Sequence, residues 1–211
     1  MVVACIVPGL RAEEGGKPFA WSPVKVQVSA FSRDLGMLDA ERDEYATNLA
    51  NCTANGITQS KATQAALDRG QRLLALALNL SPRNRRAIIV NFQLAKGLLP
   101  EEAKGDYSTP VIARLLLARS QILAKTDSQE NRLLARMFVQ LAAELDPKNE
   151  DAVYASEVDR LDHGTVDWTF LTGQRTLPTP EPPKETVRPP GVPPTGQRPT
   201  GERPTGPPRR P

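Results

Sequence analysis

Residues 70–87 read GQRLLALALNLSPRNRRA, and residues 135–152 read ARMFVQLAAELDPKNEDA. Counted from Pro82 and from Pro147, small residues, large apolar residues and an asparagine stand at the same distances in both stretches. The offset of 65 residues is about two units of a helical repeat of roughly 34 residues. Small side chains spaced along a helix, with a proline after its end, predict a helix that packs closely on a neighbour.

The apolar spacing predicts six helices in antiparallel pairs between residues 38 and 161. The first ends at Asn55-Gly56, the second spans about 60–80, and Asn84 and Asn149 cap the third and the sixth. We expect Gly97 to stop the third helix before a polar loop at residues 98–108. The residues expected on inward faces are Leu38, Tyr45, Leu49, Cys52; Leu67, Gly70, Leu74, Ala77, Leu78; Ile88, Ile89, Phe92, Ala95; Val111, Leu115, Ala118, Ile122; Leu134, Phe138, Leu141, Leu145; and Tyr154, Val158, Leu161.

Valines and polar residues alternate from Val24 to Phe31, which predicts one short β-strand. A single strand in a helical chain must pair with a partner outside this sequence or lie as an extended segment on the helices. The sequence leaves both alternatives open. Near the other end of the helices, we expect Trp168 to pack back over the last helix.

The C-terminal segment differs from the rest in composition. Thirteen of the 20 prolines lie between Thr176 and Pro211, together with six basic and three acidic residues and no aromatic residue. Such a segment buries too little apolar surface to fold, so we predict a disordered tail. It accounts for the whole net charge of +3. A basic tail can attract nucleic acid, anionic lipid or an acidic protein surface, and the lack of aromatic side chains for stacking on bases argues against nucleic acid.

The N-terminal residues 1–12 resemble the end of an export signal, although no basic residue precedes Arg11. Either this is a truncated signal, which would place the protein in the periplasm or cell envelope of a bacterium, or it is a frayed terminus of a cytoplasmic protein. No apolar run is long enough to span a membrane. The two cysteines exclude a disulfide framework.

The segment Leu145-Asp-Pro-Lys-Asn-Glu-Asp-Ala152, preceded by Ala135, Val139 and Ala142, resembles the boundary between two units of the tetratricopeptide repeat (TPR). Residues 80–87 are similar but more diverged. The resemblance implies an all-α, TPR-like solenoid of stacked hairpins, which acts as a non-catalytic scaffold and presents a concave surface to a protein or peptide.

Five polar residues are candidate binding residues. Arg83, Arg85 and Arg86 crowd the helix start at Asn84, where free backbone amides also attract anions, so we expect a partner with an acidic group there. Gln93 and Lys96 share a helix face with Arg86, and the TPR resemblance implies that this face lines the groove. The alternatives are that acidic residues at 39–44 neutralise the arginines, or that all five side chains are simply solvated.

The sequence offers no arrangement for catalysis, so we expect neither an enzyme nor a cofactor. His163 is the single histidine, expected at a helix end, and Cys52 lies on an apolar face, so neither a zinc site nor a Cys–His pair is expected.

The predicted organisation is therefore a possible truncated signal at 1–16, an extended or strand segment at 17–36, a TPR-like domain at 37–173 and a tail at 174–211. Three functions remain open: an interaction scaffold, an envelope spacer that acts through the tail, and the helical part of a larger hydrolytic assembly. The partner and the oligomeric state are left open.

Overall fold

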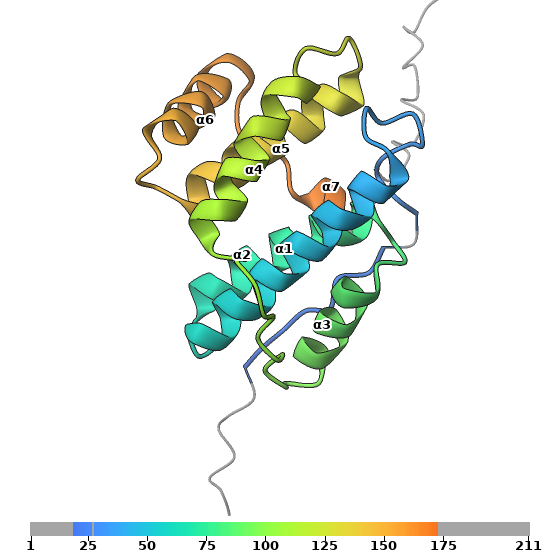
Figure 1. The fold of residues 1–211 in the computed structure, drawn as a ribbon, viewed down its shortest axis with the longest axis vertical. Helices are drawn as coiled ribbons and strands as arrows, with labels where there is room; N and C mark the ends of the chain where they lie inside the picture. The colour runs from blue at the N-terminus through green and yellow to red at the C-terminus, as the bar shows by residue number, and fades with distance from the viewer. Residues whose placement is uncertain (1–18, 27, 173–211) are drawn as a thin grey trace, which may run out of the picture. The chain divides into compact units, whose positions relative to one another are not determined.

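The computed structural model describes residues 19–26 and 28–172. Within these ranges the chain forms helices and no strand, so the described part is all-α, as expected (Figure 1). The predicted signal at 1–16 and the predicted tail at 174–211 lie outside the described residues. The helices are α1 (Asp39–Gln59), α2 (Gln64–Leu80), α3 (Arg85–Ala95), α4 (Thr109–Leu123), α5 (Gln129–Leu145), α6 (Glu150–His163) and the short α7 (Thr169–Thr172).

The helices follow the 65-residue repeat seen in the sequence. Helices α2 and α5 begin and end 65 residues apart, and so do the first residues of α3 and α6. A short turn joins α1 to α2 and α4 to α5, and the two helices of each pair pack along one another (Figure 1). We call α1–α3 the first copy and α4–α6 the second copy.

The junctions after α2 and α5 have the same hydrogen bonds. The first backbone N–H beyond the helix bonds the carbonyl oxygen of Ala77 over 2.9 Å in one copy and that of Ala142 over 3.0 Å in the other. The side-chain oxygen of each capping asparagine accepts from the backbone N–H three residues further on, over 2.9 Å at Asn84 and 3.2 Å at Asn149. Both predicted caps are therefore confirmed, and the internal repeat extends to individual hydrogen bonds.

The small residues of the repeat lie in the core. Ala77 and Ala142 are fully buried, and a Cβ added to Gly70 would lie 2.8 Å from Ile57 Cδ1, so α2 approaches α1 too closely for a larger side chain. Among the predicted core residues, those of α2 and α5 are buried: Leu67, Gly70, Leu74, Ala77, Leu78, Leu134, Phe138, Leu141 and Leu145.

The predicted end of the first helix at Gly56 is wrong, because α1 continues to Gln59. The chain reverses instead at Lys61 and Ala62, which both have positive φ. Ile57, one residue after Gly56, is buried against the rest of the core, and this burial outweighs the local tendency of Asn-Gly to stop a helix. Leu38 was also expected inside, but it precedes the helix and is exposed.

The predicted inward face of α3 is wrong as well. Ile88, Ile89 and Phe92 are exposed, as is Ala95, and the buried residues are instead Ala87, Val90 and Leu94. The rotation of α3 is set by polar contacts with α1, since Asn84 donates to Thr47 and Arg86 donates to Asn51. The predicted stop of this helix is confirmed, because Gly97 follows its end with a φ of 72°.

The inward faces predicted for the fourth and sixth helices differ from the structure in the same way. Leu115, Ala118 and Ile122 of α4 are exposed, whereas Ile112, Leu116, Leu117 and Leu123 are buried. Tyr154, Val158 and Leu161 of α6 are exposed, and Ala152 is the buried residue of that helix. In α4 a second apolar stripe faces the core, and in α6 the more apolar stripe is the exposed one, so the sequence spacing alone does not show which face is inward.

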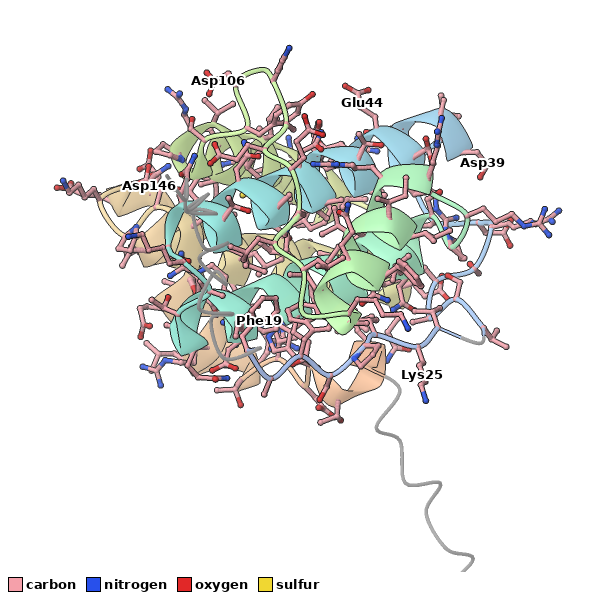
Figure 2. The ribbon with its side chains drawn as sticks, turned by 90° about the horizontal axis from the view of Figure 1, so that it is seen from below. Phe19, Lys25, Asp39, Glu44, Asp106 and Asp146 are labelled. Carbon is pink, nitrogen blue, oxygen red and sulfur yellow. The ribbon has the colours of Figure 1, made fainter. Side chains whose placement is uncertain are left out.

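The predicted strand at Val24–Phe31 is not formed within the described residues. Residues 19–26 and 28–36 run along the helices instead, and we call them the extended segment. Figure 2 shows this segment, marked by Phe19 and Lys25, running past α3. The side-chain amide of Asn91 on α3 accepts from the backbone N–H of Val24 over 3.1 Å and donates to its carbonyl oxygen over 3.0 Å. At Val24 the side chain of Asn91 thus makes the two backbone hydrogen bonds that a partner strand would make.

Two further asparagines hold the segment along its course. Asn79 of α2 accepts from the backbone N–H of Ala30 over 2.9 Å, and Asn131 of α5 accepts from that of Gly36 over 2.8 Å. The segment therefore connects α3 in the first copy to α5 in the second.

Trp168, which was predicted to pack back over the last long helix, is partly buried against the core and is hydrogen-bonded to α5. Its indole N–H donates to Gln140 of α5 over 3.2 Å. The α7 turn that follows contacts α2, where Asn79 donates to the carbonyl oxygen of Leu171 over 3.1 Å. The chain after α6 thus returns to the core helices of both copies.

Candidate functional site

Two of the predicted binding residues, Arg83 and Arg85, are exposed at the junction between α2 and α3. Among the described residues neither forms an ion pair. The nearby carboxylate of Asp43 bonds neutral donors instead, namely the Ser81 hydroxyl over 2.7 Å and the Asn84 amide over 3.0 Å. Asp43 and Arg85 both line a shallow hollow of about 290 Å³. Asp43 therefore lies near Arg85 without forming an ion pair with it.

The other three predicted residues do not share an open face. Arg86 donates from Nε to the side-chain oxygen of Asn51 on α1 over 2.7 Å and from Nη2 to the carbonyl oxygen of Glu101 over 2.7 Å, so it joins α3 to α1 and to the loop after α3. The side-chain oxygen of Gln93 is buried and has no hydrogen-bond partner in the described part of the chain. Lys96 is exposed, with its Nζ 5.6 Å from the centre of the Phe92 ring. Binding by these five residues stays a prediction.

Cys52 and His163 occupy different places. Cys52 is 3% exposed in α1, and its burial raises the pKa of the thiol to about 11, so it is a neutral core residue at physiological pH. His163 is the last residue of α6, and its Nδ1 lies 3.2 Å from a carboxylate oxygen of Asp159. Each residue is where the sequence places it, in the core and at a helix end.

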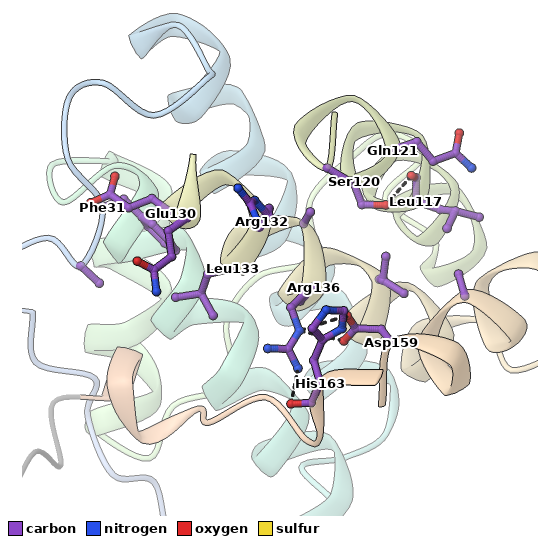
Figure 3. A pocket seen from close by; sticks show the side chains of 16 residues that line it. Phe31, Leu117, Ser120, Gln121, Glu130, Arg132, Leu133, Arg136, Asp159 and His163 are labelled. Carbon is purple, nitrogen blue, oxygen red and sulfur yellow. Dashed lines mark hydrogen bonds and ion pairs between the residues drawn. The ribbon is translucent and has the colours of Figure 1, made fainter. Parts of the chain in front are cut away.

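A larger hollow in the described part of the chain was not predicted. It is a groove of about 750 Å³, open to solvent, with mostly apolar walls (Figure 3). The walls come from all three helices of the second copy, and Phe31 of the extended segment adds to one side. The main wall residues are Leu117 and Ser120 of α4, Leu133 and Val139 of α5, and Ala155 and Asp159 of α6.

One charged cluster lies within this groove. Arg136 Nε lies 2.9 and 3.0 Å from the two carboxylate oxygens of Asp159, and the guanidinium also donates to the carbonyl oxygen of Gly164 over 2.8 Å. Figure 3 shows Arg136, Asp159 and His163 gathered in the groove. Arg136 therefore ties α5 to the body and to the C-terminal end of α6, and the charges of the cluster are largely satisfied within the protein.

The groove exists because the two copies close differently. Helix α3 packs more extensively on α1 than on α2, whereas α6 packs far more extensively on α5 than on α4. In α3, Val90 and Leu94 are buried at 0% and 1% exposure. The residues 65 positions later are Ala155, which is half-buried, and Asp159, whose carboxylate is held by Arg136. A shorter side chain and a charged one thus leave open the space that two aliphatic side chains close in the first copy.

This difference was readable in the sequence. Once the 65-residue offset is extended beyond Ala87, Val90 aligns with Ala155 and Leu94 with Asp159, so two apolar residues of one copy are matched by a small one and a charged one. The apolar residues chosen for α6 instead were Tyr154, Val158 and Leu161, which lie on its exposed face.

Two searches of the described residues give negative results. No group of three or more histidine, cysteine or acidic side chains within residues 19–26 and 28–172 is placed to hold a metal ion. In the same part of the chain, no helix combines the length and the apolar character needed to cross a membrane.

Comparison of the chain with protein-family models, with curated proteins and with solved structures finds no match in any of the three.

Proposed function

We propose that this protein is a non-catalytic, TPR-like interaction scaffold, and that its binding surface is the groove between α4, α5 and α6. The observation that carries this proposal is the open apolar groove of about 750 Å³ in the second copy. Contact of apolar surface with water is unfavourable. Covering the groove with a partner would be favourable by about 25 cal/mol for each Å² of apolar surface buried.

The internal comparison supports a binding role for the groove over a packing defect. The first copy has the same helix junctions, and there Val90 and Leu94 are buried at the corresponding positions, so the repeat itself does not require this opening. In the second copy the opening is held by a specific contact, because Arg136 bonds Asp159 and the end of α6. A side-chain cluster that holds a groove open is typical of a preorganised binding site.

The proposal also includes a second contact, in which Arg83 and Arg85 bind an acidic group of the same partner. Its support is their exposure and the absence of an ion pair to either residue within the described part of the chain. Arginines of this kind attract carboxylates at long range, so charge reversal at both positions should slow association at low salt and have little effect at high salt.

Photo-cross-linking in cells that naturally make the protein tests the groove. A photoreactive amino acid at Gln121, which lies on the groove rim, should yield a defined protein adduct, and the adduct should disappear when Ala155→Leu fills the groove. The same amino acid at Lys148, which is exposed at the α5–α6 junction, serves as the control. Equal adducts at both positions, or an adduct that survives Ala155→Leu, would show that the groove is not the binding surface.

A further inference from the structure

We infer that the partner enters the groove as an amphipathic α-helix that presents two branched aliphatic side chains one helical turn apart, at positions i and i+4. This inference rests on the proposed function, because it names the chemistry of the occupant of the same groove.

The first copy shows what fills the corresponding space. Val90 and Leu94 are four residues apart on α3, and both are buried to within 1% against α1 and α2. Their counterparts Ala155 and Asp159 line the open groove. A helix with aliphatic residues at i and i+4 places both side chains on one face at the spacing that Val90 and Leu94 have, so it supplies the atoms that α6 lacks.

An extended peptide fits the groove less well, because its backbone would lack hydrogen-bond partners. The extended segment of this protein is held through the side-chain amides of Asn79, Asn91 and Asn131, which bond backbone N–H groups at 2.8–3.1 Å. No asparagine lines the groove, and the two glutamines that do, Gln121 and Gln129, are exposed, so the groove offers an extended backbone few ordered partners. A helix satisfies its own backbone groups and needs only apolar contact from the walls.

The charges of the groove favour an apolar contact face on the occupant. Arg136 and His163 both face Asp159, and Glu130 accepts from the Ser32 hydroxyl over 2.6 Å. Because these charges have partners within the protein, a charged side chain of the occupant would be buried without compensation. The remaining wall is formed by leucine, valine and alanine side chains and Phe31, together with the polar Ser120, Gln121, Gln129 and Arg132. The charge of Arg132 is paired with Asp127.

The test uses a fluorescently labelled peptide of residues 84–97, which carries Val90 and Leu94 in the helix that closes the first copy. Its binding to the full chain is measured by anisotropy. The control peptide has Val90→Ser and Leu94→Ser, which should weaken binding about tenfold or more, because two aliphatic side chains no longer leave water. A labelled peptide of residues 19–31 represents the extended class, and a fluorescent fatty acid represents apolar small molecules.

The protein variant R136Q/A155V/D159L gives the second copy the residues of the first copy at all three positions, since Gln71 corresponds to Arg136. We expect it to fold with unchanged helicity and to lose binding of the 84–97 peptide. Ala155→Leu alone, which fills the groove and keeps the ion pair, should lose binding as well. Tyr154→Ala, on the exposed face of α6, should leave the affinity within about twofold, as expected for surface substitutions.

Preferential binding of the 84–97 peptide, with loss in both groove-filling variants, supports the inference. Equal binding of the serine-substituted peptide, or tighter binding of the 19–31 peptide or of the fatty acid at the groove, overturns the inference while the groove remains a binding site. If the groove-dependent cross-link at Gln121 is also absent, the proposed function fails together with it.

Discussion

Arg136 of α5 holds Asp159 of α6 through its Nε, which lies 2.9 and 3.0 Å from the two carboxylate oxygens. Both side chains are about four-fifths buried, and the same guanidinium reaches the backbone just beyond α6. The pair therefore joins α5 to α6 at the wall of the groove.

Replacing Arg136 by Gln should lower the free energy of unfolding by about 1–3 kcal/mol, because charge-assisted hydrogen bonds are lost and Asp159 stays partly buried. Urea unfolding followed by circular dichroism measures the change. Arg132→Gln is the matched control, since its pair with Asp127 is largely exposed and should contribute less than about 0.5 kcal/mol. Equal effects of the two substitutions would show that Arg136 has no special role in holding α6.

Two glycines in helices should respond in opposite directions. Gly56→Ala should stabilise the protein by about 0.5–1 kcal/mol, since an added Cβ meets no atom within 4 Å and alanine favours the helix. Gly70→Val should destabilise it by about 2–4 kcal/mol, because its Cβ alone would lie 2.8 Å from Ile57 and 3.0 Å from Thr53. Thermal unfolding of both variants compares the two, and a stable Gly70→Val protein would contradict the close packing of α1 on α2.

The two capping asparagines should differ in their contribution. Asn149→Ala should cost about 1 kcal/mol, the usual value for a lost helix cap. Asn84→Ala should cost about 2 kcal/mol or more, since Asn84 is 3% exposed and its amide also donates to Asp43 and to Thr47 over 2.8 Å. Chemical unfolding of the two single variants measures both values, and a larger loss at Asn149 would be inconsistent with this account.

Alkaline pH should destabilise the protein through Cys52. Burial raises the pKa of its thiol from a usual value of 9.0 to about 11, so the folded state favours the neutral thiol. This contribution is complete below pH 9 and is lost as the pH rises through 11, with an upper limit of about 2.7 kcal/mol for a two-unit shift. Tyr45, whose pKa is also raised by burial, adds to the loss at high pH.

Unfolding free energies at pH 8 and pH 10.5 test this dependence, with Cys52→Ala as the variant that removes the cysteine contribution and keeps that of Tyr45. If the pH dependence is the same in Cys52→Ala, the thiol is not its source. In a Cys5→Ser background, alkylation of Cys52 at pH 8 should proceed only through unfolding.

The extended segment should loosen locally when one asparagine is removed. Asn91→Ala should increase amide hydrogen exchange at Val24, because both hydrogen bonds to that residue are lost. Asn79→Ala should act at Ala30 and at the α7 turn, since Asn79 bonds both. Exchange measured by mass spectrometry with peptides that separate the two regions tests this; uniform exchange throughout the segment in either variant would mean that the asparagines do not act locally.

The sequence predicted the helices, the repeat and the caps well because these depend on short-range signals. The side chains of Asn84 and Asn149 accept a hydrogen bond from a backbone N–H three residues further on, which favours a helix start there. Pro82 and Pro147 cannot continue the preceding helices. The inward faces of α3, α4 and α6 were missed because each helix has apolar residues on a face that is exposed, and local spacing does not distinguish that face from the buried one. The buried face also depends on contacts between residues far apart in the sequence, such as the hydrogen bond between Arg86 and Asn51, and a local pattern does not contain these.

The strand prediction failed for a related reason. Alternation at Val24–Val28 predicts a strand, but the backbone of Val24 bonds the side chain of Asn91, which lies 67 residues away. The groove was missed because it arises from a difference between the copies, at Ala155 and Asp159, whereas the search for a repeat emphasises what the copies share.

The two copies differ at two corresponding positions: Val90 and Leu94 are buried in the first copy, and Ala155 and Asp159 line the open groove in the second. Val90 and Leu94 belong to the buried core that the two copies share, whereas Ala155, Asp159 and Arg136 line the groove and are not among its fully buried residues. Under the proposed function, substitutions at these three groove positions would therefore change the preferred ligand while the shared buried core keeps its residues.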